Sequence, residues 1–387
     1  MVPREFPKMF LCSVCAATFA EDEPRWRCHC GGYLLLDSGG MFRTAALQSR
    51  PATLWRYREA LGVADSSTPV TLGEGMTPLI EADFARHHGF LKLDFLCPTG
   101  SYKDRGSSVM ITKLKQWGLK HIIEDSSGNA GASIAAYAAL ARIRTDIYIP
   151  ASTSAGKAAQ ISMYGANLVK VPGSREDTAG AALNAAQHTF YASHNWSPHF
   201  VAGMKTAAYE LSEQMGWTVP DWVLAPAGGG GLVSGLYAGF ADLLSAGITR
   251  HMPRIAAVQA AACDPIHRAW STDAEDVPGI TKGDTVAEGI SVARPVRGRA
   301  ILSAIRQSNG LVTTVSDDEV WSALHQLGAL GIYVEPTAAA APAAFRRLRD
   351  DGTIPADATV AVMLTGSGLK ATDKIVHHLE TEAVAAV

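Results

Sequence analysis

The sequence predicts an α/β protein with two doubly wound parallel-sheet domains and a small cysteine-rich segment ahead of them. Three observations lead to this prediction. From about residue 90, short apolar runs alternate with stretches of helical periodicity. Several of the apolar runs end in loops rich in Gly and Ser. A length of 387 residues suits two domains plus an appendage.

The expected elements follow one another as strand, loop and helix. Strands are expected at 91–96, 121–125, 146–150, 167–171, 221–226, 254–259 and 358–366. Helices are expected at 102–117, 129–141, 154–163 and 174–188, from the glycines at 228–231 to about 245, and after 366. Such repeated units make right-handed crossovers and parallel sheets covered by helices. Residues 271–300, rich in Gly, Pro and charge, predict a long surface loop.

The domain organisation follows from these elements. Residues 1–45 form the cysteine-rich segment, which is too small for a core of its own. Residues 46–95 and 200–387 are expected to form a large domain, and residues 96–199 a smaller α/β domain.

The composition excludes several classes of function. Hydrophobic residues make up 47% and charged residues 18%, and the net charge is −3 with a pI near 6.5. No basic field is present that would hold nucleic acid. No apolar run reaches membrane-spanning length, and the first residues lack a signal-peptide pattern. We therefore expect a cytoplasmic protein with neither a nucleic-acid nor a membrane partner.

Four of the six cysteines lie within the first 30 residues. Cys12 and Cys15 form one pair, and Cys28 and Cys30 form another after a spacer of 12 residues. Two thiolate pairs can close a tetrahedral structural zinc site, although the second pair has one intervening residue instead of two. His29 could replace one thiolate, and a reduced, metal-free cluster is the alternative.

Lys103 is the first candidate for chemistry. It follows the strand 91–96 and a Gly-Ser turn, so it should lie in the first turn of the next helix. The helix dipole disfavours a cation at that end. The amine therefore has a reason to lose its proton, as a lysine that forms a Schiff base must. The alternative is a solvent-exposed lysine at a helix start.

A run of four glycines follows the strand 221–226 and forms the second candidate, namely Gly228, Gly229, Gly230 and Gly231. Such a run lets successive N–H groups point at one spot, and with the following helix N-terminus it suits a phosphate. Neither a P-loop nor the dinucleotide fingerprint is present, which disfavours a nicotinamide-dependent dehydrogenase. A flexible connector is the alternative.

Two further loops join strands to helices. Residues 126–131, with Asn129, offer backbone N–H groups at a helix start, or Asn129 is simply a helix N-cap. In residues 364–370, Thr365 or Ser367 can offer a hydroxyl to a ring nitrogen, or the segment is a capped turn. All four candidates lie at the carboxyl ends of parallel strands, where open α/β sheets bind ligands.

Nearly the whole chain resembles the fold type II enzymes that use pyridoxal 5′-phosphate (PLP), the tryptophan synthase β-like family, and within it the threonine synthases. Ten colinear segments carry the resemblance: 54–61, 72–79, 98–106, 126–133, 157–173, 203–210, 225–232, 287–295, 333–340 and 364–370.

The resemblance assigns roles to the candidate residues. Lys103 would form the Schiff base with PLP and then act as the base at Cα. Asn129 would hydrogen-bond the 3′-oxygen, and Gly228–Gly231 would hold the phosphate. Thr365 would face the pyridine nitrogen, and a neutral partner there suits elimination or replacement better than transamination. The family also implies a zinc-ribbon-like N-terminal segment, a small amino acid as substrate and a homodimer.

The resemblance favours threonine synthase, which converts O-phosphohomoserine and water to threonine and phosphate. Two residues depart from its phosphate site. Ala130 replaces a hydroxyl, and Phe200 stands where some threonine synthases carry an arginine. Losing such a charge-assisted contact typically costs about 1.5–3 kcal/mol. Candidates for compensation are His194, Asn195, His199, Lys157 and Arg175.

Two alternatives remain open. A threonine or serine dehydratase, or a β-replacement synthase such as one making cysteate, would use the same cofactor on another amino acid. A PLP-binding protein without catalysis is the alternative of a different class, and the intact Lys103 argues against it.

Overall fold

The computed structural model describes residues 9–37, 40–64, 67–153 and 155–385. The chain forms two compact units that interleave along the sequence. The first unit comprises Met1–Met76, Lys103–Val219 and Gly230–Met252, and the second comprises Thr77–Tyr102, Pro220–Gly229 and Pro253–Val387. The predicted domain ranges 46–95, 96–199 and 200–387 stay a proposal.

The first unit contains two sheets. The three-stranded sheet has the order β2-β1-β3 and is antiparallel, and the four-stranded sheet has the order β8-β7-β6-β9 and is parallel. Its strands are β1 (Met9–Cys12), β2 (Thr18–Ala20), β3 (Leu34–Asp37), β6 (His121–Glu124), β7 (Arg144–Pro150), β8 (Asn167–Val171) and β9 (Phe190–Tyr191).

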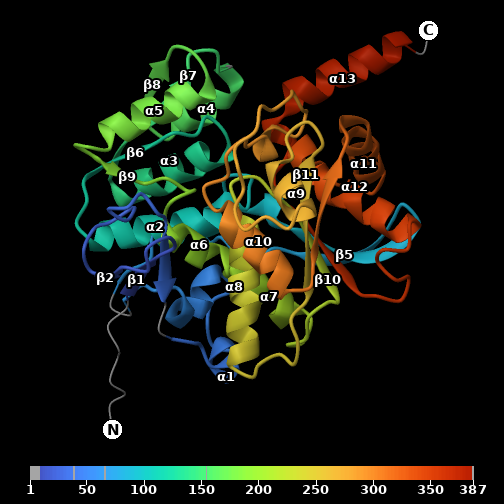
Figure 1. Ribbon diagram of the computed structural model, residues 1–387, viewed down its shortest axis with the longest axis horizontal. Helices are drawn as coiled ribbons and strands as arrows, with labels where there is room; N and C mark the ends of the chain where they lie inside the picture. Colours follow the sequence, from blue (N-terminus) through green and yellow to red (C-terminus); the bar gives the residue numbers. More distant parts are fainter. Residues whose placement is uncertain (1–8, 38–39, 65–66, 154, 386–387) are drawn as a thin grey trace. The chain divides into compact units, whose positions relative to one another are not determined.

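Helices of the first unit pack on the four-stranded sheet and on one another. They are α1 (Thr44–Leu47), α2 (Lys103–Gln116), α3 (Asn129–Ala141), α4 (Ala155–Met163), α5 (Arg175–Ala185), α6 (Pro198–Met204), α7 (Thr206–Gln214) and α8 (Gly231–Ser245), with a 3₁₀ helix at Leu54–Ala60. Helices α3, α4 and α5 contact the strands, while α2 packs between α3 and α6 (Figure 1).

The second unit is built on a six-stranded sheet of order β12-β11-β10-β13-β5-β4. The strands are β4 (Leu79–Phe84), β5 (His87–Leu93), β10 (Trp222–Pro226), β11 (Arg254–Ala260), β12 (Leu311–Val315) and β13 (Val360–Leu364). The helices are α9 (Pro265–Ser271), α10 (Gly298–Gln307), α11 (Asp317–Ala329), α12 (Pro336–Asp350) and α13 (Thr372–Ala385), with 3₁₀ helices at Asp94–Leu96, Glu288–Ile290 and Gly368–Lys370.

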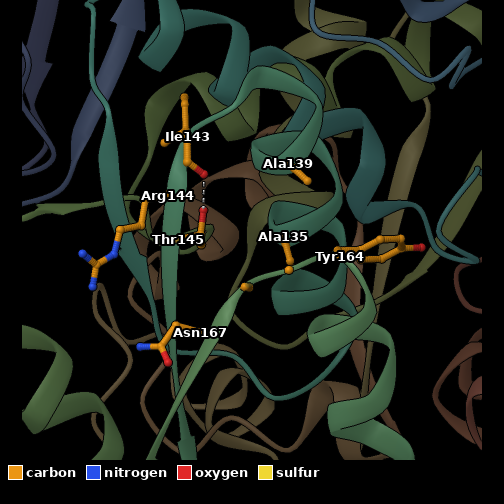
Figure 2. A pocket seen from close by; sticks show the side chains of 9 residues that line it. Ala135, Ala139, Ile143, Arg144, Thr145, Tyr164 and Asn167 are labelled. Carbon is orange, nitrogen blue, oxygen red and sulfur yellow. Dashed lines mark hydrogen bonds between the residues drawn. The ribbon is translucent and has the colours of Figure 1, made fainter.

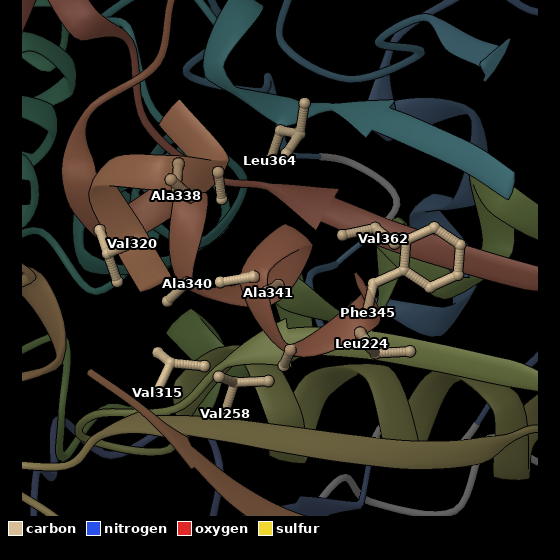
Figure 3. Close-up of a cluster of buried hydrophobic side chains, with 14 of the residues drawn as sticks. Leu224, Val258, Val315, Val320, Ala338, Ala340, Ala341, Phe345, Val362 and Leu364 are labelled. Carbon is tan, nitrogen blue, oxygen red and sulfur yellow. The ribbon is translucent and has the colours of Figure 1, made fainter. Parts of the chain in front are cut away.

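Helix α12 supplies much of the core of the second unit. Its alanines face apolar side chains of the sheet, among them Leu224 on β10, Val258 on β11 and Val362 on β13 (Figure 3). Because alanine is small, the helix backbone lies close to the strands and leaves few voids. The helix thereby packs on both β10 and β13.

The predicted fold class is confirmed, and most predicted elements are present. The strand predicted at 91–96 is corrected: β5 ends at Leu93, because buried Asp94 begins a 3₁₀ helix and accepts a hydrogen bond of 2.7 Å from Thr77. The large sheet is also not wholly parallel, because β4 pairs with β5 antiparallel. Ala85 and Arg86 have the positive φ angles that a tight hairpin requires. Among the described residues, no helix combines the length and apolarity needed to cross a bilayer.

Candidate active site

Lys103 is the first residue of α2, in agreement with its predicted place in the first turn of a helix. Its Nζ lies 5.7 Å from the ring centroid of Phe200, which is fully buried on α6. Helix α2 approaches this ring closely, because a Cβ at Gly106 would lie 2.6 Å from a phenyl carbon. Phe200 therefore forms a rigid apolar wall beside the lysine amine.

The amino end of α8 contacts the same ring. Gly230 has φ 98° and forms the N-cap of α8, and a Cβ at Gly231 would lie 3.8 Å from Phe200. The unpaired N–H groups of a helix N-terminus attract an anion. Within the first unit, the structure thus brings the Lys103 amine and the N-terminus of α8 to one phenyl ring.

Asn129 begins α3, whose N-cap is Gly128, so the interpretation of Asn129 as an N-cap is wrong. The first turn of α2 and the second turn of α3 are joined by Ser133, whose hydroxyl donates to Asp104 Oδ1 at 2.6 Å. Gly131 permits the loop before α3 to fold back, because a Cβ there would lie 1.9 Å from the carbonyl oxygen of Ser126. Lys103 and Asn129 therefore stand at the starts of two packed helices.

The second unit brings Gly228 and Thr365 to neighbouring strand ends. Gly228 and Gly229 follow β10, and Thr365 follows β13, which is parallel to β10 and adjacent to it. A Cβ at Gly228 would lie 3.1 Å from the backbone of Gly289, so the loop packs tightly. Thr365 is 2% exposed, and its Oγ1 has no hydrogen-bond partner among the described residues.

The segment just before Lys103 is hydrogen-bonded to the loop that contains Thr365. The amide of Tyr102 donates to the carbonyl oxygen of Thr365 at 3.0 Å, and the amide of Ser367 donates to Gly100 at 2.9 Å. Lys370 Nζ donates to the carbonyl oxygen of Thr99 at 2.8 Å. These bonds fix the backbone from which Lys103 continues.

A cluster of buried polar groups lies at the carboxyl end of β6 in the first unit. Glu124 Oε1 lies 2.6 Å from His194 Nδ1, and its Oε2 has no partner among the described residues. Asp125 pairs with Arg175 at 2.7 Å and accepts a hydrogen bond of 2.7 Å from Tyr191. Burial and the charge of Asp125 raise the pKa of Glu124 well above its usual value. Burial, with the charges of Lys103 and Arg175, lowers the pKa of His194.

Sequence reasoning named His194 and Arg175 only as possible phosphate ligands and missed Glu124 and Asp125. The signal was present, since two acidic residues follow two isoleucines at the end of the predicted strand, directly before the Ser-Ser-Gly-Asn loop. Acidic side chains are almost never fully buried without a specific reason.

The other compensation candidates are engaged elsewhere or not described. His199 is buried and lies 2.9 Å from Glu21 Oε1. Asn195 is half-buried and lies two residues before Ser197, the N-cap of α6. Its backbone N–H donates to the Ser193 hydroxyl at 3.4 Å. The side chain of Lys157 lies outside the described residues.

The four N-terminal cysteines converge around the three-stranded sheet. All four Sγ atoms lie within 4.8 Å of one another, with Cys12 and Cys30 at 3.4 Å and Cys15 and Cys28 at 3.6 Å. Four thiolates on one zinc ion at about 2.3 Å would have similar spacings. His29 is not part of the group, because its Nε2 lies 3.2 Å from Arg25.

A cavity of about 230 Å³ lies at the opposite edge of the four-stranded sheet. Arg144 and Thr145 at the start of β7, Asn167 at the start of β8 and the end of α3 line it (Figure 2). Ligands of open α/β sheets bind at the carboxyl ends of the strands, so this cavity is separate from the candidate site.

Comparison with known proteins identifies the class. Residues 70–366 match the model of the family described as "Pyridoxal-phosphate dependent enzyme", and the chain belongs to this family. It is similar to threonine synthases from Methanocaldococcus jannaschii (32% identity, 95% of this chain and 94% of the relative) and Synechocystis (36% identity, 83% and 85%). The chain is therefore a threonine synthase-like PLP-dependent lyase, which sets aside a non-catalytic binding protein.

Solved structures agree on the fold. The T.th. threonine deaminase has a TM-score of 0.63 at 26% identity, with 76% of this chain and 92% of that chain covered. Maize serine racemase has a TM-score of 0.67 at 22% identity, with 86% and 100% covered. The second likeness shows the fold alone.

Proposed function

We propose that this protein converts O-phosphohomoserine and water to threonine and phosphate. The threonine synthase relatives, which the chain matches over most of its length, favour this reaction. The observation that carries the proposal is the Lys103 amine at the first turn of α2, on the same phenyl ring as the amino end of α8.

The residues present fit PLP. Gly228–Gly231 would hold its phosphate, because they lead into the N-terminus of α8 with the backbone free of side chains. Thr365 would donate or accept at the pyridine nitrogen, since its buried hydroxyl has no other partner among the described residues. Asn129 would hydrogen-bond the 3′-oxygen. Bound PLP would supply an electron sink that makes the Cα proton of an amino acid acidic.

Lys103 is the proposed Schiff-base lysine and the base that takes the Cα proton. Phe200 places an apolar surface beside this amine.

Phe200 also favours a second candidate, which is a dehydratase or a β-replacement synthase. The phenyl ring at this position offers no charge to a substrate phosphate. A substrate with a hydroxyl or another neutral leaving group would need none. Arg175, the arginine of the polar cluster, already pairs with Asp125.

The substrate test uses purified holoenzyme with O-phosphohomoserine, L-threonine and L-serine in separate reactions. Release of phosphate with formation of threonine supports the first candidate. Release of ammonia and a keto acid from threonine or serine, without turnover of O-phosphohomoserine, supports the second. Lys103→Ala should abolish either reaction, whereas Lys115→Ala, which removes an exposed lysine of the same helix, should not.

Structural zinc at Cys12, Cys15, Cys28 and Cys30 is part of the proposal, supported by the four converging sulfur atoms. Metal analysis of protein purified without chelator should find one zinc per chain. A homodimer is proposed from the family resemblance, and a cytoplasmic location from the composition. Light scattering of the purified protein tests the dimer.

A further inference from the structure

The polar cluster at the end of β6 contains a directly bonded acid–imidazole pair. Glu124 is the last residue of β6, and His194 comes shortly after β9, the strand next to β6. The two side chains lie 2.6 Å apart. The Glu124 side chain is fully buried, whereas that of His194 is 12% exposed. The imidazole is therefore the member of the pair that a substrate can touch.

The pair adjoins the site lysine. The His194 ring packs edge-on against Phe200, with centroids 5.8 Å apart, and Lys103 Nζ lies 5.7 Å from the same phenyl centroid. The charge of Lys103 also contributes to the lowered pKa of His194 and opposes the raised pKa of Glu124. Lys103 and His194 thus flank one phenyl ring within the first unit.

Two opposite pKa shifts favour the neutral form of the pair. Burial, with the charge of Asp125, favours the protonated carboxyl of Glu124, because it raises that pKa. Burial, with the charges of Lys103 and Arg175, favours the neutral imidazole. In the neutral form, the Glu124 carboxyl donates to Nδ1 of His194, and this hydrogen bond assigns the remaining imidazole proton to Nε2.

We propose that His194 is a catalytic residue that exchanges a proton with the oxygen on Cβ of the substrate, and that Glu124 is its positioning residue. The inference rests on the proposed function, in which Lys103 handles the Cα proton. It serves both candidate reactions, because threonine synthesis adds water at Cβ and a dehydratase removes hydroxide from Cβ.

Elimination begins at Cα. The Lys103 amine takes the Cα proton, and the electron pair left behind forms the Cα–Cβ double bond while the Cβ–O bond breaks. The oxygen departs with its electron pair, takes the Nε2 proton of His194 and leaves as water. The carboxyl proton of Glu124 passes to Nδ1. In the addition direction, the oxygen of water bonds to Cβ and its proton goes to Nε2.

Isotope exchange with L-threonine separates the two proton transfers. The holoenzyme should exchange the Cα proton with deuterium from D₂O and the hydroxyl oxygen with ¹⁸O from labelled water. In His194→Gln, the oxygen exchange should fall about 100-fold or more, while the Cα exchange stays close to that of the wild type. Equal losses in both exchanges, or no loss in either, would overturn the inference.

A matched control lies on the same strand. His121, the first residue of β6, pairs with Asp146 at 2.8 Å at the opposite edge of the sheet. His121→Gln removes a similar histidine–carboxylate pair and should leave both exchanges unchanged. If it reduces oxygen exchange as His194→Gln does, the effect is one of folding and the inference fails.

Cofactor-free protein gives a second readout. Nitrogen-15 NMR should show His194 neutral at about pH 7, with Nδ1 accepting a hydrogen bond that weakens in Glu124→Gln. The groups facing the pair are Lys103, Asp125, Arg175 and Tyr191, so a shift in its titration is assigned by comparison with Glu124→Gln. A doubly protonated His194 contradicts the inference. A wild type that turns over no amino acid, but shows the neutral pair, instead contradicts the proposed function.

Discussion

The ion pair between Arg105 and Glu210 should hold the start of α2 in place. Two bonds of 2.5 and 2.7 Å join the guanidinium to the carboxylate, and both side chains are fully buried. Arg105 lies two residues after Lys103, and Glu210 lies on α7. Glu210→Gln leaves a buried guanidinium without a counter-charge, which should lower the free energy of unfolding by about 3–5 kcal/mol.

The surface pair of Arg50 and Glu59 provides the comparison. It is also bidentate, with bonds of 2.8 and 2.5 Å, but its side chains are 25% and 30% exposed. Glu59→Gln should therefore change stability by only about 0–1 kcal/mol. Urea denaturation of the cofactor-free variants measures both values. Similar losses in the two variants would refute the argument that burial makes the Arg105 pair essential.

Three further predictions concern the cofactor, the metal and pH. Thr365→Val removes a buried hydroxyl that has no partner within the described part of the chain, so cofactor-free protein should keep its melting temperature. The affinity for PLP, measured by absorbance titration, should fall, and an unchanged affinity argues against the assigned contact. The Cys28→Ser variant should lose zinc, as measured by metal analysis, and its three-stranded sheet should melt at a lower temperature in calorimetry. A variant with full zinc content contradicts the four-thiolate site. Burial opposes the ionised form of Glu21, but His199 and Lys113 lower its pKa below the usual 4.5. A lowered pKa stabilises the fold above about pH 4.5, and this stability is lost as the pH falls through the folded pKa. Glu21→Gln should flatten the acid side of the melting-temperature profile, and an unaltered slope there would show that Glu21 contributes nothing.

Local patterns predicted the helices that carry the site. Helix α3 has the bounds 129–141 expected from its alanine-rich sequence, and it ends where Arg142 adopts a left-handed conformation. The antiparallel hairpin of β4 and β5 was not predicted, because its turn contains Ala85 and Arg86 instead of the usual Asn or Gly.

The acid–imidazole pair was beyond the reach of local patterns. Glu124 and His194 are 70 residues apart, and only the pairing of β6 with β9 brings them together. The sequence alone also gave no way to see that Phe200 would pack against Lys103. Loop motifs in the sequence point to candidate ligand-binding residues. Which side chains surround these residues depends on contacts between distant strands, and local sequence patterns do not show such contacts.

Reduction of the holoenzyme with borohydride tests the central claim most directly. The treatment fixes the cofactor to the amine that holds it, and peptide mapping by mass spectrometry locates the pyridoxyl group. We predict a single tag on Lys103. A tag on another lysine, or none after reconstitution with PLP, would contradict the assignment of this site.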